Sequence, residues 1–466
     1  MTTECRDICG YHLKRAFDGV KWLQDLSVHV DVDGRISAVV ADDNPGGLHV
    51  LHGPVMPGFT NLHSHAFQFA MAGLTEARKN PVDTFWSWRE MMYYFALRLS
   101  PDDQVAVAAK LYLECLKRGY TGVVEFHYIH NAPDGAAYAR PEQMSLATLE
   151  AAAVSGIQLT HLPVFYAHSD FGGQAPGEGQ RRFVTSLDGF ARMLDDLRGP
   201  CREQGVTLGL APHSLRAVSE DEIKALAEIH TGLGDDAPFH IHVAEQLPEV
   251  EAALAYNGKR PVEMLFDLAD VDARWCLIHA THMTGAETEM VARSGAVVGL
   301  CPLTEANLGD GVFNGPAFLK AGGSFGVGSD SNVNTDPFAE LQMLEYSQRL
   351  LHNQRTVMAS DQHVNTGTSL TAMALAGGAQ AAGRKSGRIA TGYMADFFEL
   401  AEEGDHAYAR LATSALLDYR MFSQNPRVVG DVVVAGKQIL SAGRHPQEDA
   451  INASFQQAMT GLCQEI

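Results

Sequence analysis

The stretch Pro57-Gly58-Phe59-Thr60-Asn61-Leu62-His63-Ser64-His65 places two histidines at the carboxyl end of a predicted strand. Residues i and i+2 of a strand point to the same side, so the imidazoles of His63 and His65 leave one face together and can share a cation. Taken alone the pattern is weak, because a chain with 20 histidines can contain it by chance. Its position adds weight, since the active sites of α/β barrels lie where the strands end. The stretch therefore predicts a barrel strand that carries a metal site.

Beyond this stretch, helices with clear start signals alternate with short apolar strands. Ser100-Pro101-Asp102-Asp103 supplies an N-cap with proline at the first helical position, and a strand at 121–126 follows that helix. The unit returns with the capping box Ser219-Glu220-Asp221-Glu222 before an apolar strand at 239–243. Repeated helix and strand units of this kind form parallel sheets that are buried on both faces. We expect an α/β fold, with a metal-dependent, TIM-like (β/α)8 barrel over residues 57–385.

The two ends of the chain carry β-hairpin signals instead. Polar and apolar residues alternate over 27–40 around Asp33-Gly34, a pattern that is typical of a hairpin. We expect a small β-sandwich module that flanks the barrel and is built from both chain ends, residues 1–56 and residues 386–466. Its late strands are expected at 397–400, 431–435 and 438–440.

Composition and charge exclude several classes of protein. The 466 residues are 46% apolar and 20% charged, which favours a folded core over a disordered chain. The formal charge of −21 creates a field that repels nucleic acid and anionic lipid. The seven cysteines never form Cys-x-x-Cys, so we expect no disulfide framework, no thiolate zinc site and a cytoplasmic location. Without an uncharged apolar run of about 18 residues, no membrane partner is expected.

Three further predicted strands end in residues that can bind or activate a metal ion. His242 ends one strand with Glu245 just beyond it, and His279 and Asp330 end two others. A histidine in such a strand can instead be a hydrogen-bonded core residue, and that alternative stays open for His240 and His242. An aspartate without a basic neighbour in sequence is costly to bury unless a cation meets it. Nitrogen and oxygen ligands without cysteine suit one Zn²⁺ per chain, with Fe²⁺ or another divalent ion as alternatives.

Neither of two other enzyme motifs predicts a function for this chain. Gly322-Gly323-Ser324-Phe325-Gly326 matches the Gly-x-Ser-x-Gly of serine hydrolases, but that elbow needs a strand before the serine and a helix after it. The predicted order here is helix and then strand, so Gly322 and Gly323 are expected to end a helix. Since no Gly-x-Gly-x-x-Gly follows a predicted strand, no nucleotide cofactor is expected.

Larger blocks of sequence extend the pattern of single residues. They are His65-Ala66-Phe67-Gln68, Ala70-Met71-Ala72-Gly73-Leu74, Phe85-Trp86-Ser87-Trp88-Arg89-Glu90, Glu125-Phe126-His127-Tyr128, His213-Ser214-Leu215-Arg216-Ala217-Val218, Thr304-Glu305-Ala306-Asn307-Leu308-Gly309-Asp310-Gly311 and the segment 387–396. With the strand-end residues, they resemble the amidohydrolase superfamily in its branch of mononuclear zinc deaminases. Between about residues 51 and 443 the chain is similar to the formimidoylglutamate deiminase family. Phe69, where that family tends to have arginine, and Asn332 depart from its pattern.

The resemblance implies a role for each strand-end residue. Zinc would be bound by His63, His65, His242 and Asp330. Glu245 would move protons with the help of Asp330, and His279 would polarise the substrate or hold the hydroxide. The substrate would be bound by Gln68, Arg89, Tyr128, His213 and Arg216.

The implied reaction is zinc-dependent hydrolysis of N-formimino-L-glutamate to N-formyl-L-glutamate and ammonia. Guanidinium forks at Arg89 and Arg216 independently suit a dicarboxylate amidine, although a surface salt bridge is the alternative for each. The alternative enzyme is a related deaminase of another amidine, a guanidino compound or a nucleobase. A barrel that only stores or senses metal would leave Glu245 and His279 without a role. We also expect a homodimer, and segment 171–180 is either a lid or a surface connection.

Overall fold

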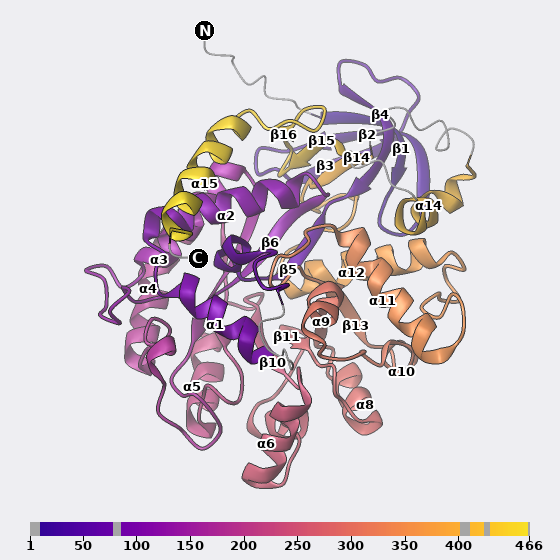
Figure 1. The fold of residues 1–466 in the computed structure, drawn as a ribbon. Coiled ribbons are helices and arrows are strands. Elements are labelled where there is room, and N and C mark those ends of the chain that lie inside the picture. The colour runs from indigo at the N-terminus through magenta and orange to yellow at the C-terminus, as the bar shows by residue number, and fades with distance from the viewer. Residues whose placement is uncertain (1–9, 78–84, 401–410, 424–428, 465–466) are drawn as a thin grey trace.

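Strands from both ends of the chain form one seven-stranded mixed sheet, seen at the top of Figure 1. The computed structural model describes residues 10–77, 85–400, 411–423 and 429–464. In the sheet order β16-β15-β14-β4-β1-β2-β3, β4 pairs with β1 on one side and with β14 on the other. The strands are β1 (Gly10–Phe17), β2 (Trp22–Val30), β3 (Ile36–Ala41), β4 (His49–Pro57), β14 (Phe397–Leu400), β15 (Val429–Val434) and β16 (Lys437–Leu440).

This sheet confirms the hairpin and only part of the expected module. β2 and β3 pair antiparallel on either side of Asp33-Gly34, with Val28 opposite Val39. The expected β-sandwich is not confirmed, because the described strands at the two chain ends belong to this single sheet. Parts of the expected module, including 1–9, 401–410 and 424–428, lie outside the described residues.

The middle of the chain supplies two parallel sheets. The first has the order β5-β6-β7-β8, with β9 beside β7, and the second has the order β10-β11-β12-β13. Isolated bridges link the two sheets at both seams, from Ser64 to Asp330 and from Leu210 to Phe239. The strands are β5 (Phe59–Ser64), β6 (Tyr120–His127), β7 (Gln158–Phe165), β8 (Thr207–Leu208), β9 (Ala211–Pro212), β10 (Phe239–Val243), β11 (Trp275–His279), β12 (Val297–Leu300) and β13 (Ser324–Val327).

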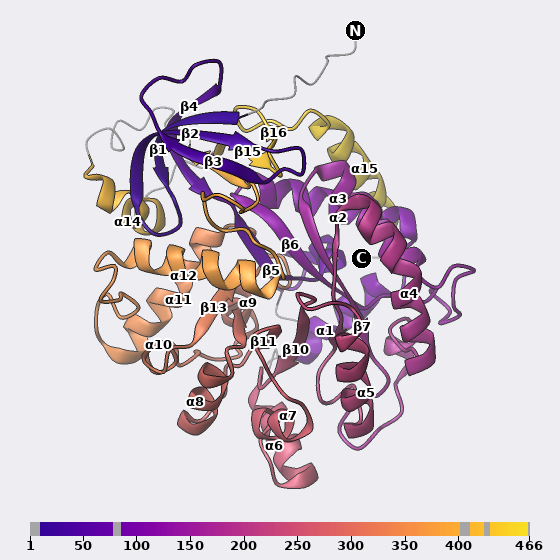
Figure 2. The ribbon, with the colours of Figure 1, turned by 180° about the vertical axis from the view of Figure 1, so that it is seen from behind.

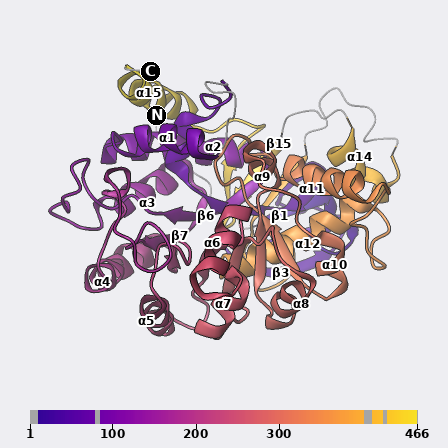
Figure 3. The ribbon, with the colours of Figure 1, turned by 60° about the horizontal axis from the view of Figure 1, so that its bottom comes forward.

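Helices surround these parallel strands, as the view in Figure 3 shows. Their apolar faces and the strands share one large buried core. The helices are α1 (Phe85–Ala96), α2 (Pro101–Leu116), α3 (Gln143–Ser155), α4 (Leu187–Gln204), α5 (Glu220–Thr231), α6 (Leu247–Asn257), α7 (Pro261–Leu268), α8 (Gly285–Ser294), α9 (Pro302–Leu308), α10 (Gly315–Lys320), α11 (Pro337–His352), α12 (Thr366–Ala381), α14 (Leu416–Phe422) and α15 (Glu448–Leu462). Short 3₁₀ turns are η1 (Ala66–Met71), η2 (Glu178–Gln180) and η3 (Thr413–Ala415). Figure 2 shows the same arrangement from behind, with α15 beside α2 and α3.

The helix ends confirm the sequence signals. Ser100 and Ser219 each accept the backbone N–H three residues on and complete a capping box with that residue's carboxylate. Gly322, with φ of +83°, follows α10, and Ser324 then begins β13. The order is helix and then strand, so the serine-hydrolase elbow is absent at Ser324. None of the described helices is both long enough and apolar enough to cross a membrane.

Gly58 lies where the chain passes from the mixed sheet into the parallel one. β4 ends at Pro57, β5 begins at Phe59, and the Gly58 N–H donates to the carbonyl of Asp396 at 2.9 Å. A Cβ at Gly58 would lie 1.9 Å from Oγ1 of Thr121. Only glycine therefore fits at this crossing. The expected domain boundaries at residues 56 and 386 stay predictions.

Candidate metal centre and active site

The four predicted metal ligands converge at the carboxyl ends of three strands. His63 is the last residue but one of β5, His65 follows that strand, His242 lies in β10, and Asp330 lies just beyond β13. All four are at least 94% buried. The Nε2 atoms of His63 and His242 are 3.0 Å apart, and Oδ1 of Asp330 lies 3.5 Å from Nε2 of His63 and 3.3 Å from Nε2 of His65. These distances place the donor atoms around one small space.

Backbone carbonyls orient two of the imidazole rings toward this space. Nδ1 of His65 donates to the carbonyl of Phe126 at 2.9 Å, and Nδ1 of His242 donates to the carbonyl of His213 at 2.8 Å. A carbonyl can only accept, so each Nδ1 carries the proton and each Nε2 presents a lone pair to the centre. Burial lowers the pKa of His63 to about 3 and that of His242 well below its ordinary value, which favours neutral rings. Lone pairs of neutral imidazoles beside a carboxylate are what a divalent cation requires.

The backbone around Asp330 is strained and tightly held. Asp330 has φ of +46°, and its N–H donates to the carbonyl of His63 at 2.9 Å. Asn332, with φ of +62°, donates to the carbonyl of His65 at 2.9 Å and accepts from Oγ of Ser329. Asn332 thus ties the segment after β13 to the end of β5. Although burial opposes its charge, the contacts with His63 and His65 keep the pKa of Asp330 well below its usual value.

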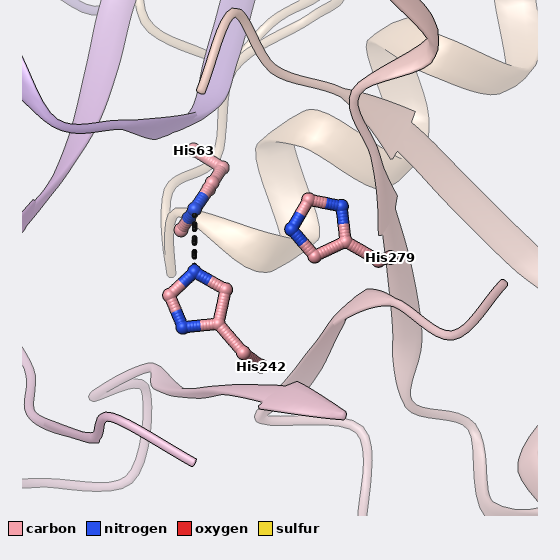
Figure 4. A group of neighbouring side chains, drawn as sticks. All are labelled: His63, His242 and His279. Atoms are coloured by element: carbon pink, nitrogen blue, oxygen red, sulfur yellow. Dashed lines mark hydrogen bonds between the residues drawn. The ribbon is translucent and has the colours of Figure 1, made fainter. Parts of the chain in front are cut away.

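His279 lies beside the metal candidates and among carboxylates. Its Nε2 is 3.8 Å from Oδ2 of Asp330 and 4.0 Å from Oε1 of Glu245, and its Nδ1 is 3.2 Å from Oε1 of Glu305. Burial would lower its pKa, but Glu245 and the other two carboxylates raise the pKa of His279 to about 10. In Figure 4, the rings of His63, His242 and His279 approach one another from three strands. A protonated His279 can donate a hydrogen bond to oxygen bound at this centre.

A cavity opens onto this cluster. The five residues predicted to bind substrate all line it: Gln68, Arg89, Tyr128, His213 and Arg216. They join His65, His242, Glu245, His279 and Asp330 in its wall. Nε2 of Gln68 donates to the Tyr128 hydroxyl at 2.8 Å, while Nε of Arg216 is buried without a hydrogen-bond partner in the described part of the chain. The structure thus brings all eleven predicted site residues together, with His63 in the cluster behind the wall.

Several residues of the site were not predicted from the sequence. Tyr166 lines the cavity directly after β7, so the rule that found His65 could have found it. Glu305, whose carboxylate holds His279, lies in the block at 304–311, but the resemblance assigned it no role. Glu249 accepts the N–H groups of Ala244 and Glu245 at 3.3 and 2.9 Å, and nothing in sequence marked it. The remaining residues of the cavity wall are Trp88, Met92, Tyr93, Ser169, Ser214, Phe183, Thr304, Leu308 and Ser331.

Other candidates lie away from the cavity. Ser324 is exposed at the amino end of β13, whereas the metal candidates follow the carboxyl ends of strands. His240 is a core residue whose Nε2 donates to the carbonyl of Ala381 at 2.7 Å. Phe69 packs against Phe455 of α15, with ring centroids 5.7 Å apart. No residue of segment 171–180 lines the cavity, so its function as a lid stays a prediction.

Comparison with known proteins agrees with this geometry. Residues 55–439 match the model of the amidohydrolase family. The chain is 46% identical to the formimidoylglutamate deiminase of Pseudomonas aeruginosa, over 95% of this chain and 96% of that protein. It is 28% identical to 5-methylthioadenosine/S-adenosylhomocysteine deaminase 2 of Archaeoglobus fulgidus, over 79% of this chain and 80% of that protein.

Solved structures extend the likeness to the fold. The crystal structure of an amidohydrolase from Brucella melitensis, 45% identical, has a TM-score of 0.92 over 97% of this chain and 99% of its own. An adenosine deaminase from Xanthomonas campestris with bound zinc has a TM-score of 0.80 over 97% and 98% of the two chains; at 20% identity it shows the fold alone. Family match, identity and fold agree: the chain belongs to the amidohydrolase family.

Proposed function

We propose that this chain hydrolyses N-formimino-L-glutamate to N-formyl-L-glutamate and ammonia, with one zinc ion per chain. The observation that carries the proposal is the presence of two arginines, Arg89 and Arg216, in the same cavity as the histidine and aspartate cluster. A planar guanidinium group suits a carboxylate, and this substrate carries two of them. The 46% identity to a relative named formimidoylglutamate deiminase supports the same substrate.

His63, His65, His242 and Asp330 are the residues that would hold the ion. Three neutral imidazoles and one carboxylate suit Zn²⁺, with Fe²⁺ as the alternative. A zinc ion bound here would lower the pKa of water toward about 7 and so supply a nucleophile at neutral pH. Burial excludes bulk water from these side chains, which strengthens their electrostatic interactions with the substrate.

Glu245, Asp330 and His279 carry the proton transfers in this proposal. Glu245 accepts one proton of the attacking water as its oxygen adds to the formimino carbon, and then delivers that proton to the leaving nitrogen. Asp330 accepts the second water proton when the C–N bond breaks, the carbonyl forms and ammonia departs. His279, held by Glu305, donates its Nε2 proton to the oxygen that gains negative charge at the reacting carbon.

The substrate is oriented by residues of α1 and η1 and of the segments that follow β6 and β9. Arg89 and Arg216 bind its carboxylates, and Gln68, Tyr128 and His213 complete its site. His213 also fixes His242, since its backbone carbonyl accepts the Nδ1 proton of that ring. A displacement of the His213 backbone would therefore disturb both substrate binding and metal binding.

We extend the proposal to the whole molecule. The two parallel sheets, bridged at both seams, form the wall of one (β/α)8 barrel over residues 57–385. Residues 1–56 and 386–466 form a second unit around the mixed sheet. The enzyme is cytoplasmic, in keeping with the free cysteines in the described part of the chain. It is a homodimer, which light scattering on purified protein tests.

Ammonia release from a panel of substrates tests the proposed function. N-formimino-L-glutamate should be hydrolysed far faster than N-formimino-L-aspartate, adenine or guanine, because a shorter chain or a neutral ring cannot engage both arginines. Purified protein of known zinc content is assayed with each compound at the same concentration. Faster turnover of a nucleobase, or full turnover after zinc is removed, would overturn the proposal.

A further inference from the structure

Tyr166 is a polar residue of the cavity to which the proposed mechanism gives no role. It directly follows β7, is 6% exposed, and lines the cavity together with Arg89 and Arg216. Its ring packs against His213 and Phe183, with centroid distances of 4.9 and 5.8 Å. These contacts fix the ring, so the direction of the hydroxyl proton is the remaining freedom of this side chain.

Gln180, at the end of η2, determines part of that direction. Its Oε1 accepts the N–H of Gly177 at 2.8 Å, and its side chain is buried. Because a backbone N–H can only donate, the amide oxygen must face Gly177, and Nε2 must face Tyr166. Nε2 lies 2.5 Å from the Tyr166 hydroxyl oxygen. Gln180 is therefore a donor to Tyr166, and the hydroxyl proton cannot point at Gln180.

Arg89 lines the same cavity wall as Tyr166 and acts electrostatically on its hydroxyl group. A guanidinium group can only donate, and a hydroxyl oxygen has two lone pairs and one proton. Because Gln180 donates to one lone pair and a guanidinium group cannot accept, the proton of Tyr166 is left for an acceptor other than Gln180 and Arg89. Arg216 also acts electrostatically on Tyr166. Two nearby guanidinium groups favour an anionic oxygen as that acceptor.

We propose that Tyr166 donates a hydrogen bond to a carboxylate of the substrate beside Arg89 and Arg216. Gln180 is then a positioning residue, which keeps the Tyr166 hydroxyl directed to the substrate. The inference rests on the proposed function and deepens it, because it assigns selection of the dicarboxylate to a tyrosine as well as to the arginines. It also links segment 171–180 to substrate binding through its last residue.

The variant Tyr166→Phe tests the hydrogen bond and keeps the ring. Hydrogen bonds to charged groups contribute enough that the KM for N-formimino-L-glutamate should rise about tenfold or more, with kcat changed less than about threefold. Two further substrates each lack one of the two carboxylates: N-formimino-4-aminobutyrate lacks the α-carboxylate, and N-formimino-L-2-aminobutyrate lacks the side-chain carboxylate. The effect of Tyr166→Phe on KM should disappear with whichever of them lacks the carboxylate that Tyr166 binds. Equal losses with all three substrates would overturn the proposal.

A double-mutant cycle with Gln180→Met tests the positioning role. Gln180→Met alone should raise KM, whereas adding it to Tyr166→Phe should cause no further rise, because Gln180 acts through the hydroxyl. A purely structural role of Gln180 would instead add its full effect to that of Tyr166→Phe, and this result would overturn the proposal. Thermal unfolding of each variant identifies any that is misfolded.

Two matched variants control for the loss of a tyrosine hydroxyl and of a loop glutamine. Tyr138→Phe removes a hydroxyl that lies 3.2 Å from a guanidinium nitrogen of Arg182 and outside the cavity wall. Gln174→Met changes an exposed glutamine of segment 171–180. Both should leave KM unchanged. A rise in KM as large as that of Tyr166→Phe in either control would overturn the assignment.

Binding of glutarate separates this inference from the proposed function. Glutarate carries two carboxylates at the spacing found in glutamate but has no amidine, so calorimetry measures recognition without turnover. Tyr166→Phe should weaken glutarate binding by about tenfold or more. Unchanged binding would overturn the role of Tyr166. If the wild-type chain binds glutarate but releases no ammonia from N-formimino-L-glutamate, the proposed function fails and the role of Tyr166 stands.

Discussion

In the proposed mechanism, Glu245 moves protons and does not hold the metal. Its carboxylate lies 4.0 Å from Nε2 of His279, and its N–H donates to Glu249. Glu245→Gln keeps the shape of the side chain and removes its basicity, so kcat should fall by about 100-fold or more while zinc content stays unchanged. Ammonia release and metal analysis measure both. Glu251→Gln, at an exposed position of α6, should behave as wild type; a Glu245→Gln protein that lost its zinc would contradict this role.

Arg216 keeps its charge in the cavity because carboxylates lie near it. Burial opposes the charge, but Glu249 and Glu245 raise the pKa of Arg216. Arg216→Met removes a charge-assisted pair with a substrate carboxylate, which should raise KM by roughly 10- to 100-fold and change kcat less. Steady-state kinetics measure the two constants, with exposed Arg192→Met on α4 as the control. An unchanged KM would remove Arg216 from the substrate site.

Residues of the site differ in how well sequence predicts them. His63 and His65 were predictable because alternation along a strand and a position at its end are local properties. Tyr166 obeys the same positional rule, which could have found it, but a tyrosine in such a place can also be an ordinary core residue, so the rule alone gives it no function. Glu249 acts through a bond to the backbone of Glu245 that only the turn after β10 creates. Local patterns therefore reveal ligands more readily than the residues that orient them.

At the scale of elements, the junction between β4 and β5 depends on one glycine. A Cβ at Gly58 would lie within 2.5 Å of three side-chain atoms of Thr121. Gly58→Ala should therefore lower the melting temperature by several degrees, as overpacking commonly costs about 1–3 kcal/mol. Gly461→Ala, within α15 and with nothing near its Cβ, should instead stabilise by up to about 1 kcal/mol. Equal melting temperatures for the two variants would contradict this account.

Helix starts and the hairpin were predicted correctly, because their sequence signals are local. Ser100 and Ser219 mark helix starts, and Asp33-Gly34 marks a hairpin, because each depends on residues within a few positions. Local signals did not predict the order of the strands in the sheet. β4 lies between β1 and β14, although β4 and β14 are more than 300 residues apart in sequence. Pairing over such a distance depends on the folded core; the described strands form one mixed sheet, and the expected sandwich is not confirmed.

At the scale of the molecule, the metal candidates connect separate parts of the fold. His63 belongs to the first parallel sheet, whereas His242 and Asp330 belong to or follow strands of the second. An ion held by all of them would join the two sheets beside the bridge from Ser64 to Asp330. A ligand that binds only the folded state stabilises it in proportion to the logarithm of its concentration over its dissociation constant.

Removal of metal should therefore abolish ammonia release and also lower the melting temperature by several degrees. Dialysis against a chelator, followed by scanning calorimetry before and after addition of Zn²⁺, measures the shift. An ion present at 100 times its dissociation constant contributes about 2.7 kcal/mol, which is large enough to detect. His242→Asn lacks one of the converging Nε2 lone pairs, so its melting temperature should respond much less to Zn²⁺. If both proteins responded equally, the ion would bind elsewhere, and the convergence of the three strand ends would need another cause.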